Sequence, residues 1–235
     1  MRRAAALALL LVVGCAEGDQ GPAADTGYAS ALTTHLETEF GTEVATVITE
    51  IVPGEPQLDL LPVPPTANWP YWTVVTLGMA TKSMTVPPGF DRIFARAELA
   101  VVLPADWFGP DGASPDGRIT EENWAPLADL KELARFPHSQ NTWLGPGHTV
   151  QWGRIGAASE MSAYLVHWPE TMQIDVVQVP LPDGAPVNIY AIFPVHPGEL
   201  DFAMENDSDA LLELLLDRPD PLVWNLQRRP VIGPG

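Results

Sequence analysis

Two histidines near the middle of the chain are the first residues whose type and spacing suggest chemistry. His138 and His148 lie on either side of a Gly-Pro-Gly turn at residues 145–147, which can bring them together. A catalytic zinc site needs three protein ligands and an open fourth position. Because the histidines form no H-E-x-x-H pair, a third ligand would be a distant carboxylate such as Glu199. A metal-dependent hydrolase is therefore an alternative, and a structural turn is the preferred interpretation.

Other catalytic patterns are missing from the sequence. There is no G-x-S-x-G elbow of a serine hydrolase, and the glycines at 145–147 match neither a P-loop nor a dinucleotide-binding turn. The acidic pair at residues 121–122 opens a predicted helix, where negative charge is stabilising, so capping explains it better than glycosidase chemistry. These observations predict a protein without enzymatic activity, cofactor or bound metal.

The N-terminus has the organisation of an export signal. Two arginines precede an apolar run, residues 4–13, which is shorter than the roughly 20 residues needed to span a bilayer. The run ends in VVGC, which resembles the lipobox of bacterial lipoproteins, where the cysteine receives diacylglycerol. We expect residues 1–14 to be a lipoprotein signal peptide, and residues 15–25 to be the lipidated Cys15 with a flexible tether. A buried helix with an incidental cysteine is the alternative.

The charge of the chain restricts its partners. It has 12 Lys+Arg against 30 Asp+Glu, a formal net charge of −18. This excess argues against binding to nucleic acid and against charge-driven association with anionic lipid. We therefore expect membrane contact only through the N-terminal lipid, and an unidentified protein as partner. The export signal predicts a location in the bacterial cell envelope, on its periplasmic or surface face.

Hydrophobic periodicity predicts one α+β domain over residues 26–235. Helices are predicted at residues 26–40, from Thr120 to about Arg135, and at 207–216. Asp183-Gly184 predicts a hairpin between the last two strands. Strand composition is found at residues 43–52, 58–63, 71–80, 92–103, 162–168, 172–179 and 187–193. The stretch 92–103 is also compatible with a helix, and a strand is preferred there.

Four motifs occur in an order that resembles the suppressor-of-fused (SUFU-like) domain family. They are TLGMATKSM at 76–84, AELAVVLPADW at 97–107, WAPLADLKELARFPHSQNTWLGPGHTV at 124–150, and VNIYAIFPVHPGEL at 187–200. The resemblance extends over about residues 41–230. It implies a single domain with a mixed β-sheet flanked by helices and no enzymatic activity.

The same resemblance implies a protein-binding function. The animal member of the family binds a protein segment, partly by adding it as a strand beside its sheet. By family position, the expected partner-binding residues are Phe136, Asn141, Thr142, Trp143, Gly147 and His148. The animal protein has a tyrosine in place of Phe136 and an acidic residue in place of Gly147, so the animal partner itself is not expected. Immunity against a toxin, as for some bacterial relatives, is one version of this function, and a purely structural envelope lipoprotein is a further alternative.

Overall fold

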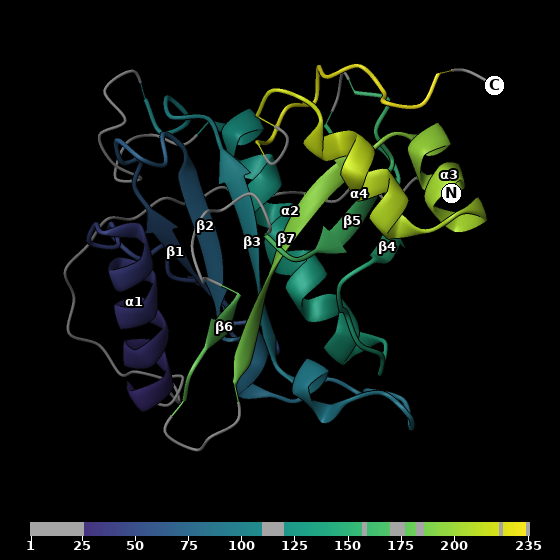
Figure 1. Cartoon of the computed structure of the whole chain (residues 1–235). Coiled ribbons are helices and arrows are strands. Elements are labelled where there is room, and N and C mark those ends of the chain that lie inside the picture. The colour runs from purple at the N-terminus through teal and green to yellow at the C-terminus, as the bar shows by residue number, and fades with distance from the viewer. Residues whose placement is uncertain are drawn as a thin grey trace.

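A mixed seven-stranded β-sheet forms the centre of the molecule (Figure 1). The computed structural model describes residues 26–109, 120–156, 159–169, 177–181, 186–220 and 223–233. The strands are β1 (Asp59–Val63), β2 (Trp72–Leu77), β3 (Ala97–Leu103), β4 (His148–Gln151), β5 (Ala163–His167), β6 (Gln178–Val179) and β7 (Val187–Val195). The helices are α1 (Thr26–Phe40), α2 (Glu121–Ser139), α3 (Pro197–Glu205) and α4 (Ser208–Leu216), with short 3-10 helices η1 (Met79–Thr81) and η2 (Arg92–Ala95).

The strands follow the order β1-β2-β3-β7-β5-β4, and β6 pairs with the first residues of β7. Neighbouring strands are antiparallel except for β3 and β7, which are parallel. Both of these central strands are buried along their whole length, as expected for strands covered on two faces. The sequence-based expectation of a single α+β domain with a mixed sheet flanked by helices is therefore confirmed.

Two hydrophobic clusters lie on the two faces of the sheet. One cluster contains the buried side chains of α1, α3 and α4, and the other contains those of α2. Figure 1 shows the same arrangement, with α2 behind the sheet and the other three helices in front. The fold is thus three layers, and each helix layer contributes an apolar stripe to one face.

Helix α1 has the predicted limits because its apolar residues recur every four positions. Tyr28, Leu32, Leu36 and Phe40 are all buried on the sheet. Gly41 follows with a φ of 65°, the left-handed conformation that ends helices and that glycine adopts without strain. Helix α4 is also confirmed, and its N-cap residue Asp207 accepts a hydrogen bond from the main chain of Ala210.

Helix α2 begins as predicted and ends later than predicted. The side chain of Thr120 accepts a hydrogen bond from the main-chain N–H of Asn123, which is the expected N-cap. The helix continues past Arg135 to Ser139, although Pro137 lies in its last turn. A proline costs most in a helix interior, and here it removes one donor only at the end of the element.

Four strand predictions are confirmed, since 58–63, 71–80, 162–168 and 187–193 contain β1, β2, β5 and β7. The stretch 92–103 is a strand only from Ala97, because η2 occupies residues 92–95 with Asp91 as its cap. Strand β6 forms only the last two residues of the stretch 172–179, most of which lies outside the described residues. The pairing of β6 with β7 is antiparallel, and the predicted turn Asp183-Gly184 also lies outside the described residues.

The predicted strand at residues 43–52 is wrong. Ile48 forms an isolated bridge to Leu60, and Ala45 adds a single main-chain hydrogen bond to Pro62, so no strand is formed. The main-chain N–H of Glu50 donates to the Asp59 carboxylate, and the Glu50 carboxylate in turn accepts from two later main-chain N–H groups of the same connection. Side-chain acceptors therefore take the place of a strand ladder, and the β-branched composition does not produce a strand.

Helix α3 and strand β4 are elements that the sequence did not predict. Helix α3 starts at Pro197-Gly198, a pair more typical of turns, but proline is well tolerated in the first turn of a helix. Strand β4 has only four residues. None of the helices described in the structure is both long and apolar enough to cross a bilayer.

Candidate binding edge of the sheet

Strand β4 is the last strand of the sheet, and its outer side is open. In its antiparallel pairing with β5, Val150 lies opposite Tyr164, and Trp152 N donates to Ser162 O. In an antiparallel pair every second residue exchanges hydrogen bonds with the neighbouring strand, and here these are Val150 and Trp152. The main-chain groups of the residues between them, Thr149 and Gln151, therefore point away from β5. Gln151 is exposed and Thr149 is partly exposed. These two residues thus present donors and acceptors to a further strand.

The opposite edge of the sheet is different because the chain itself covers it. Ile48 exchanges two main-chain hydrogen bonds with Leu60 of β1, with N···O distances of 3.0 and 3.1 Å. Ala45 N donates to Pro62 O at 2.8 Å. Of the two ends of the β1-to-β4 strand order, β4 is therefore the one whose outer edge is uncovered among the described residues.

The turn that leads into β4 is fixed by main-chain contacts. Asn141 has a φ of 49°, which reverses the chain after α2. Thr142 N donates to Pro137 O at 2.9 Å, and Thr142 O accepts from Thr85 N at 3.0 Å. Two of the predicted partner-binding residues thus hold the turn against α2 and against the connection between β2 and β3.

Gly147 and His148 form the start of the edge strand. Gly147 has a φ of 84°, and its N–H donates to Val166 O of β5 at 2.8 Å. A Cβ at this position would lie 2.6 Å from the Ser208 hydroxyl oxygen, so α4 approaches the edge closely here. Burial lowers the pKa of His148, and a main-chain hydrogen bond with Trp143 offsets this only in part. The imidazole is therefore neutral at neutral pH.

A group of aromatic rings centred on Trp143 lies beside His148, on the side of the sheet that α2 covers. The Trp143 ring lies edge-on to the His148 ring, with a centroid distance of 4.4 Å. Phe90 and Phe94, from the connection between β2 and β3, also pack on Trp143, with ring centroids 5.1 and 5.8 Å from that of the tryptophan. Phe136 is half-buried and packs on the same hydrophobic cluster as Trp143. The six predicted residues therefore lie in α2, in the turn that follows it, or at the start of the edge strand.

The histidines that suggested a metal site do not form one with Glu199. His138 Nε2 lies 3.1 Å from Met79 O, and burial lowers the pKa of its ring more than this contact raises it. Glu199 is fully buried in α3, and its carboxylate oxygens bind Arg228 at 2.5 and 2.6 Å. No group of three or more His, Cys, Asp or Glu side chains that could hold a metal occurs within the described part of the chain.

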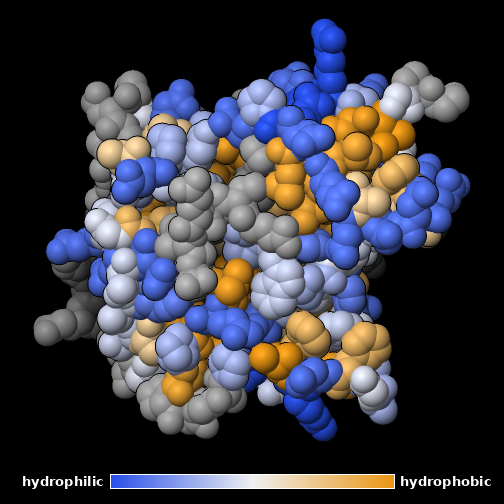
Figure 2. All heavy atoms as spheres, in the orientation of Figure 1, coloured by the Kyte–Doolittle hydropathy of each residue, from blue (hydrophilic) through white to orange (hydrophobic). Residues whose placement is uncertain are grey.

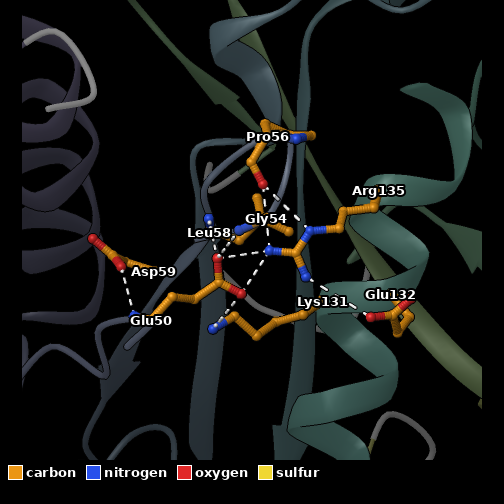
Figure 3. A network of polar contacts seen from close by, with 8 residues as sticks. All are labelled: Glu50, Gly54, Pro56, Leu58, Asp59, Lys131, Glu132 and Arg135. Atoms are coloured by element: carbon orange, nitrogen blue, oxygen red, sulfur yellow. Dashed lines mark hydrogen bonds and ion pairs between the residues drawn. The ribbon is translucent and has the colours of Figure 1, made fainter. Parts of the chain in front are cut away.

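A charged network fixes α2, and through it the turn, to the connection before β1 (Figure 3). Both oxygens of the Glu50 carboxylate accept hydrogen bonds from Arg135 Nη2, at 2.6 and 2.7 Å, and Lys131 Nζ lies 3.1 Å away. Arg135 also donates to Pro56 O at 3.3 Å. Burial alone would raise the pKa of Glu50, but these hydrogen bonds and the Lys131 charge outweigh burial and lower it.

A second carboxylate, Glu98 of β3, fixes α1 and the turn after β2. It is fully buried and accepts hydrogen bonds from the Tyr28 hydroxyl of α1 and from Thr76 Oγ1. It also accepts from three successive main-chain N–H groups, those of residues 78, 79 and 80. Burial raises the pKa of Glu98 despite these donors. The family motif A-E-L thus contains a structural carboxylate.

Sequence reasoning missed three parts of this site: strand β4, the phenylalanines that contact Trp143, and the partner of Arg135. Phe90 and Phe94 are four positions apart around Arg92, and nothing in that spacing indicates contact with Trp143. An acidic residue in the β-branched stretch 43–52 was the available signal for Glu50, since a carboxylate is uncommon in a buried strand.

Comparison with known proteins agrees with this fold. The family model for the suppressor of fused protein (SUFU) matches residues 54–229. The chain belongs to the SUFU family. No curated protein sequence matches the chain of this SUFU-family protein.

Solved structures share the fold at low sequence identity. The structure of the Sufu–Fu complex has a TM-score of 0.62 and 16% identity, with 87% of this chain and 92% of that chain covered. Drosophila Suppressor of Fused gives a TM-score of 0.63 and 17% identity over 87% of this chain and 51% of that chain. A SUFU homologue from Neisseria gonorrhoeae gives 0.60 and 17% over 88% and 98%. This SUFU-family chain therefore spans about half of the Drosophila protein.

Proposed function

We propose that this protein is a non-enzymatic binding module that adds an extended segment of a partner protein to the outer edge of β4. The observation that carries the proposal is the open edge, where Thr149 and Gln151 direct main-chain groups away from β5. Main-chain hydrogen bonds supply affinity in strand addition, and side-chain contacts on alternate residues supply selectivity. The complex named for one similar structure, Sufu with Fu, supports a protein as partner.

The site predicted at residues 136–148 fits this function as the frame of the edge. Asn141 and Thr142 hold the turn, while Trp143 and His148 lie beside the strand that a partner would extend. None of these residues is arranged as a nucleophile with a base, and the buried carboxylates are used in hydrogen bonds and ion pairs. The arrangement therefore supports recognition better than it supports the hydrolase alternative.

The proposal is tested by removing one donor from the open edge. Thr149→Pro deletes an N–H that makes no ladder bond with β5, and proline is tolerated on edge strands in that position. Thr149→Val is the matched control, because it keeps the N–H and the strand propensity. Tagged full-length protein is cross-linked in the cells that naturally make it, and the recovered proteins are compared between wild type and both variants.

We expect a partner that wild type and Thr149→Val recover equally and that Thr149→Pro loses, while all three unfold at the same temperature. Equal recovery by the proline variant would exclude strand addition at this edge. If the recovered partner is a toxin, the function is immunity against that toxin. Growth of cells that express the toxin, with and without this protein, would test the immunity function.

The lipid anchor is a separate part of the proposal and rests on the N-terminal sequence. Residues 1–25 lie outside the described residues, so the support is the charged start, the apolar run and VVGC. Cys15→Ser removes the acceptor thiol, and the protein should then leave the membrane fraction and keep its N-terminal extension. Retention of the variant in the membrane fraction would exclude lipidation at Cys15 as the anchor.

A further inference from the structure

Four rings at the start of β4 and beside it form an aromatic face, defined as Phe90, Phe94, Trp143 and His148, in which Phe90 is exposed and the other three rings are partly buried. Trp143 is in the middle and contacts the other three rings. Phe90 is 56% exposed, and it is one of the few large hydrophobic residues that the described surface exposes to this extent. In Figure 2 the lower right of the molecule, where Figure 1 has the connection between β2 and β3, shows hydrophobic residues at the surface beside strongly hydrophilic ones.

The aromatic face lies in the cation-rich part of an acidic chain. The segments 80–96 and 136–154, which form it, contain a single carboxylate, that of Asp91. Their cations are Lys82, Arg92, Arg96 and Arg154. The whole chain has 12 Lys+Arg against 30 Asp+Glu, so these segments reverse its balance. Arg92 is exposed in η2 between the two phenylalanines, and Lys82 is close enough to His138 to lower the pKa of its ring.

The pleat of β4 relates this face to any strand added outside it. His148 and Val150 lie opposite Val166 and Tyr164, which point to the side of the sheet that α2 covers. Thr149 lies opposite Leu165, which points to the other side. Side chains of an added strand continue this alternation. Its residues opposite His148 and Val150 therefore point to the aromatic face.

The other side of the same edge has the opposite charge. Asp209 of α4 lies 2.9 Å from His167 of β5, and Ser208 lies against Gly147. The carboxylates of Asp207 and Asp209 are exposed there. An acidic side chain is therefore favoured on one side of an added strand and disfavoured on the other.

From these observations we propose that the segment bound at β4 carries its bulky apolar and its acidic side chains on the same face, that is, at every second position. This face is directed toward Phe90, Trp143 and Arg92. The proposal rests on strand addition at β4 as the function. It names the chemistry of the partner: an extended protein segment with an apolar–acidic face, bound by an otherwise acidic chain.

The test is selection of random twelve-residue peptides displayed on phage against the full-length protein, followed by affinity measurements on the selected peptides. We expect selected sequences in which large apolar residues (Phe, Leu or Ile) and acidic residues (Asp or Glu) both occur at every second position, on the same face of the strand. Phe90→Ala and Arg92→Glu should each weaken binding roughly fivefold or more, the effect of one partly buried ring or one charge contact. Met204→Ala and Arg229→Glu, matched changes on α3 and the C-terminal tail, should leave affinity unchanged.

The outcomes separate this inference from the proposed function. Peptides that lose binding to Thr149→Pro but bind Phe90→Ala and Arg92→Glu as wild type would leave strand addition intact and overturn the apolar–acidic face. Peptides unaffected by Thr149→Pro would overturn strand addition itself. A selection that enriches no peptide would overturn both. High salt should remove the loss of affinity caused by Arg92→Glu, because that contact is between charges. The loss caused by Phe90→Ala should persist in high salt, because that contact is apolar.

Discussion

The charged network between α2 and the connection before β1 gives the sharpest stability prediction. The Glu50 side chain is 9% exposed and faces two cations, Arg135 and Lys131. It also accepts hydrogen bonds from the main-chain N–H groups of Gly54 and Leu58 at 3.3 and 3.1 Å. The three substitutions Glu50→Gln, Arg135→Met and Lys131→Met remove one charge each and keep the approximate side-chain length.

The three variants should differ in a definite order. Glu50→Gln leaves two cations adjacent and partly desolvated, and breaking a buried pair in this way costs about 3–5 kcal/mol. Arg135→Met leaves the carboxylate with Lys131 and both main-chain donors, so we expect about 2 kcal/mol from the lost charged hydrogen bonds. Lys131→Met leaves the two short contacts from Arg135 in place and should cost about 1–2 kcal/mol.

Urea unfolding at several pH values is the assay. The pKa of Glu50 is lowered in the folded protein, so its stabilising contribution is complete above its unfolded pKa of about 4.3. That contribution is lost as the pH falls through the folded pKa. The difference in unfolding free energy between wild type and Glu50→Gln should therefore be constant near neutral pH and shrink below about pH 4.

Two results would refute this reasoning. If Arg135→Met costs as much as Glu50→Gln, Lys131 and the two main-chain donors do not compensate the carboxylate once the guanidinium is gone, and the expected order is wrong. If the cost of Glu50→Gln is the same at about pH 3.5 as at pH 7, folding does not lower the pKa of Glu50.

Three further substitutions test other contacts. Glu98→Gln should cost about 2–3 kcal/mol in chemical denaturation, because its NH2 group would face main-chain donors that now bind a carboxylate oxygen; an unchanged midpoint would contradict this. Gly147→Ala should lower stability by about 1–2 kcal/mol from its positive φ, and by more than Gly153→Ala, which has a similar φ and open space around it. Arg228→Met leaves the fully buried Glu199 carboxylate without its cation and should cost about 3–5 kcal/mol, measured by thermal or urea unfolding at neutral pH.

Elements with one dominant period could be predicted from the sequence. Helix α1 was predicted to the residue because Tyr28, Leu32, Leu36 and Phe40 form one stripe and a glycine follows. The central strands β2 and β7 were predicted from their continuous apolar runs. In these elements local propensity and burial favour the same structure.

Where side chains take over the main-chain hydrogen bonds, composition was misleading. The stretch 43–52 has the residues of a strand, yet Ile51 and Val52 are exposed and Glu50 is turned inward to Arg135. The partner that decides this conformation is 85 positions away in the sequence. No local pattern contains that information, so the error is one of tertiary context overriding propensity.

The site required the same kind of long-range information. Its candidate residues were predicted as one group, but the structure gives them two physical roles. Asn141, Thr142 and Gly147 fix the main chain of the turn through a left-handed residue, paired hydrogen bonds and a close approach to α4. Trp143 and His148 instead present rings beside an open strand edge.

This division changes what the net charge of −18 means for recognition. The total correctly argues against a phosphate backbone as partner, because such binding needs many clustered cations. It does not describe the surroundings of β4, where the segment that carries Phe90 and Phe94 also contains Lys82 and Arg92, and Asp209 lies on the other side of the sheet. Exposed charges act over about a Debye length, roughly 8–10 Å, so a strand at this edge experiences the local charges more than the total. An acidic segment can therefore bind an acidic protein, provided that its carboxylates all point to the aromatic face.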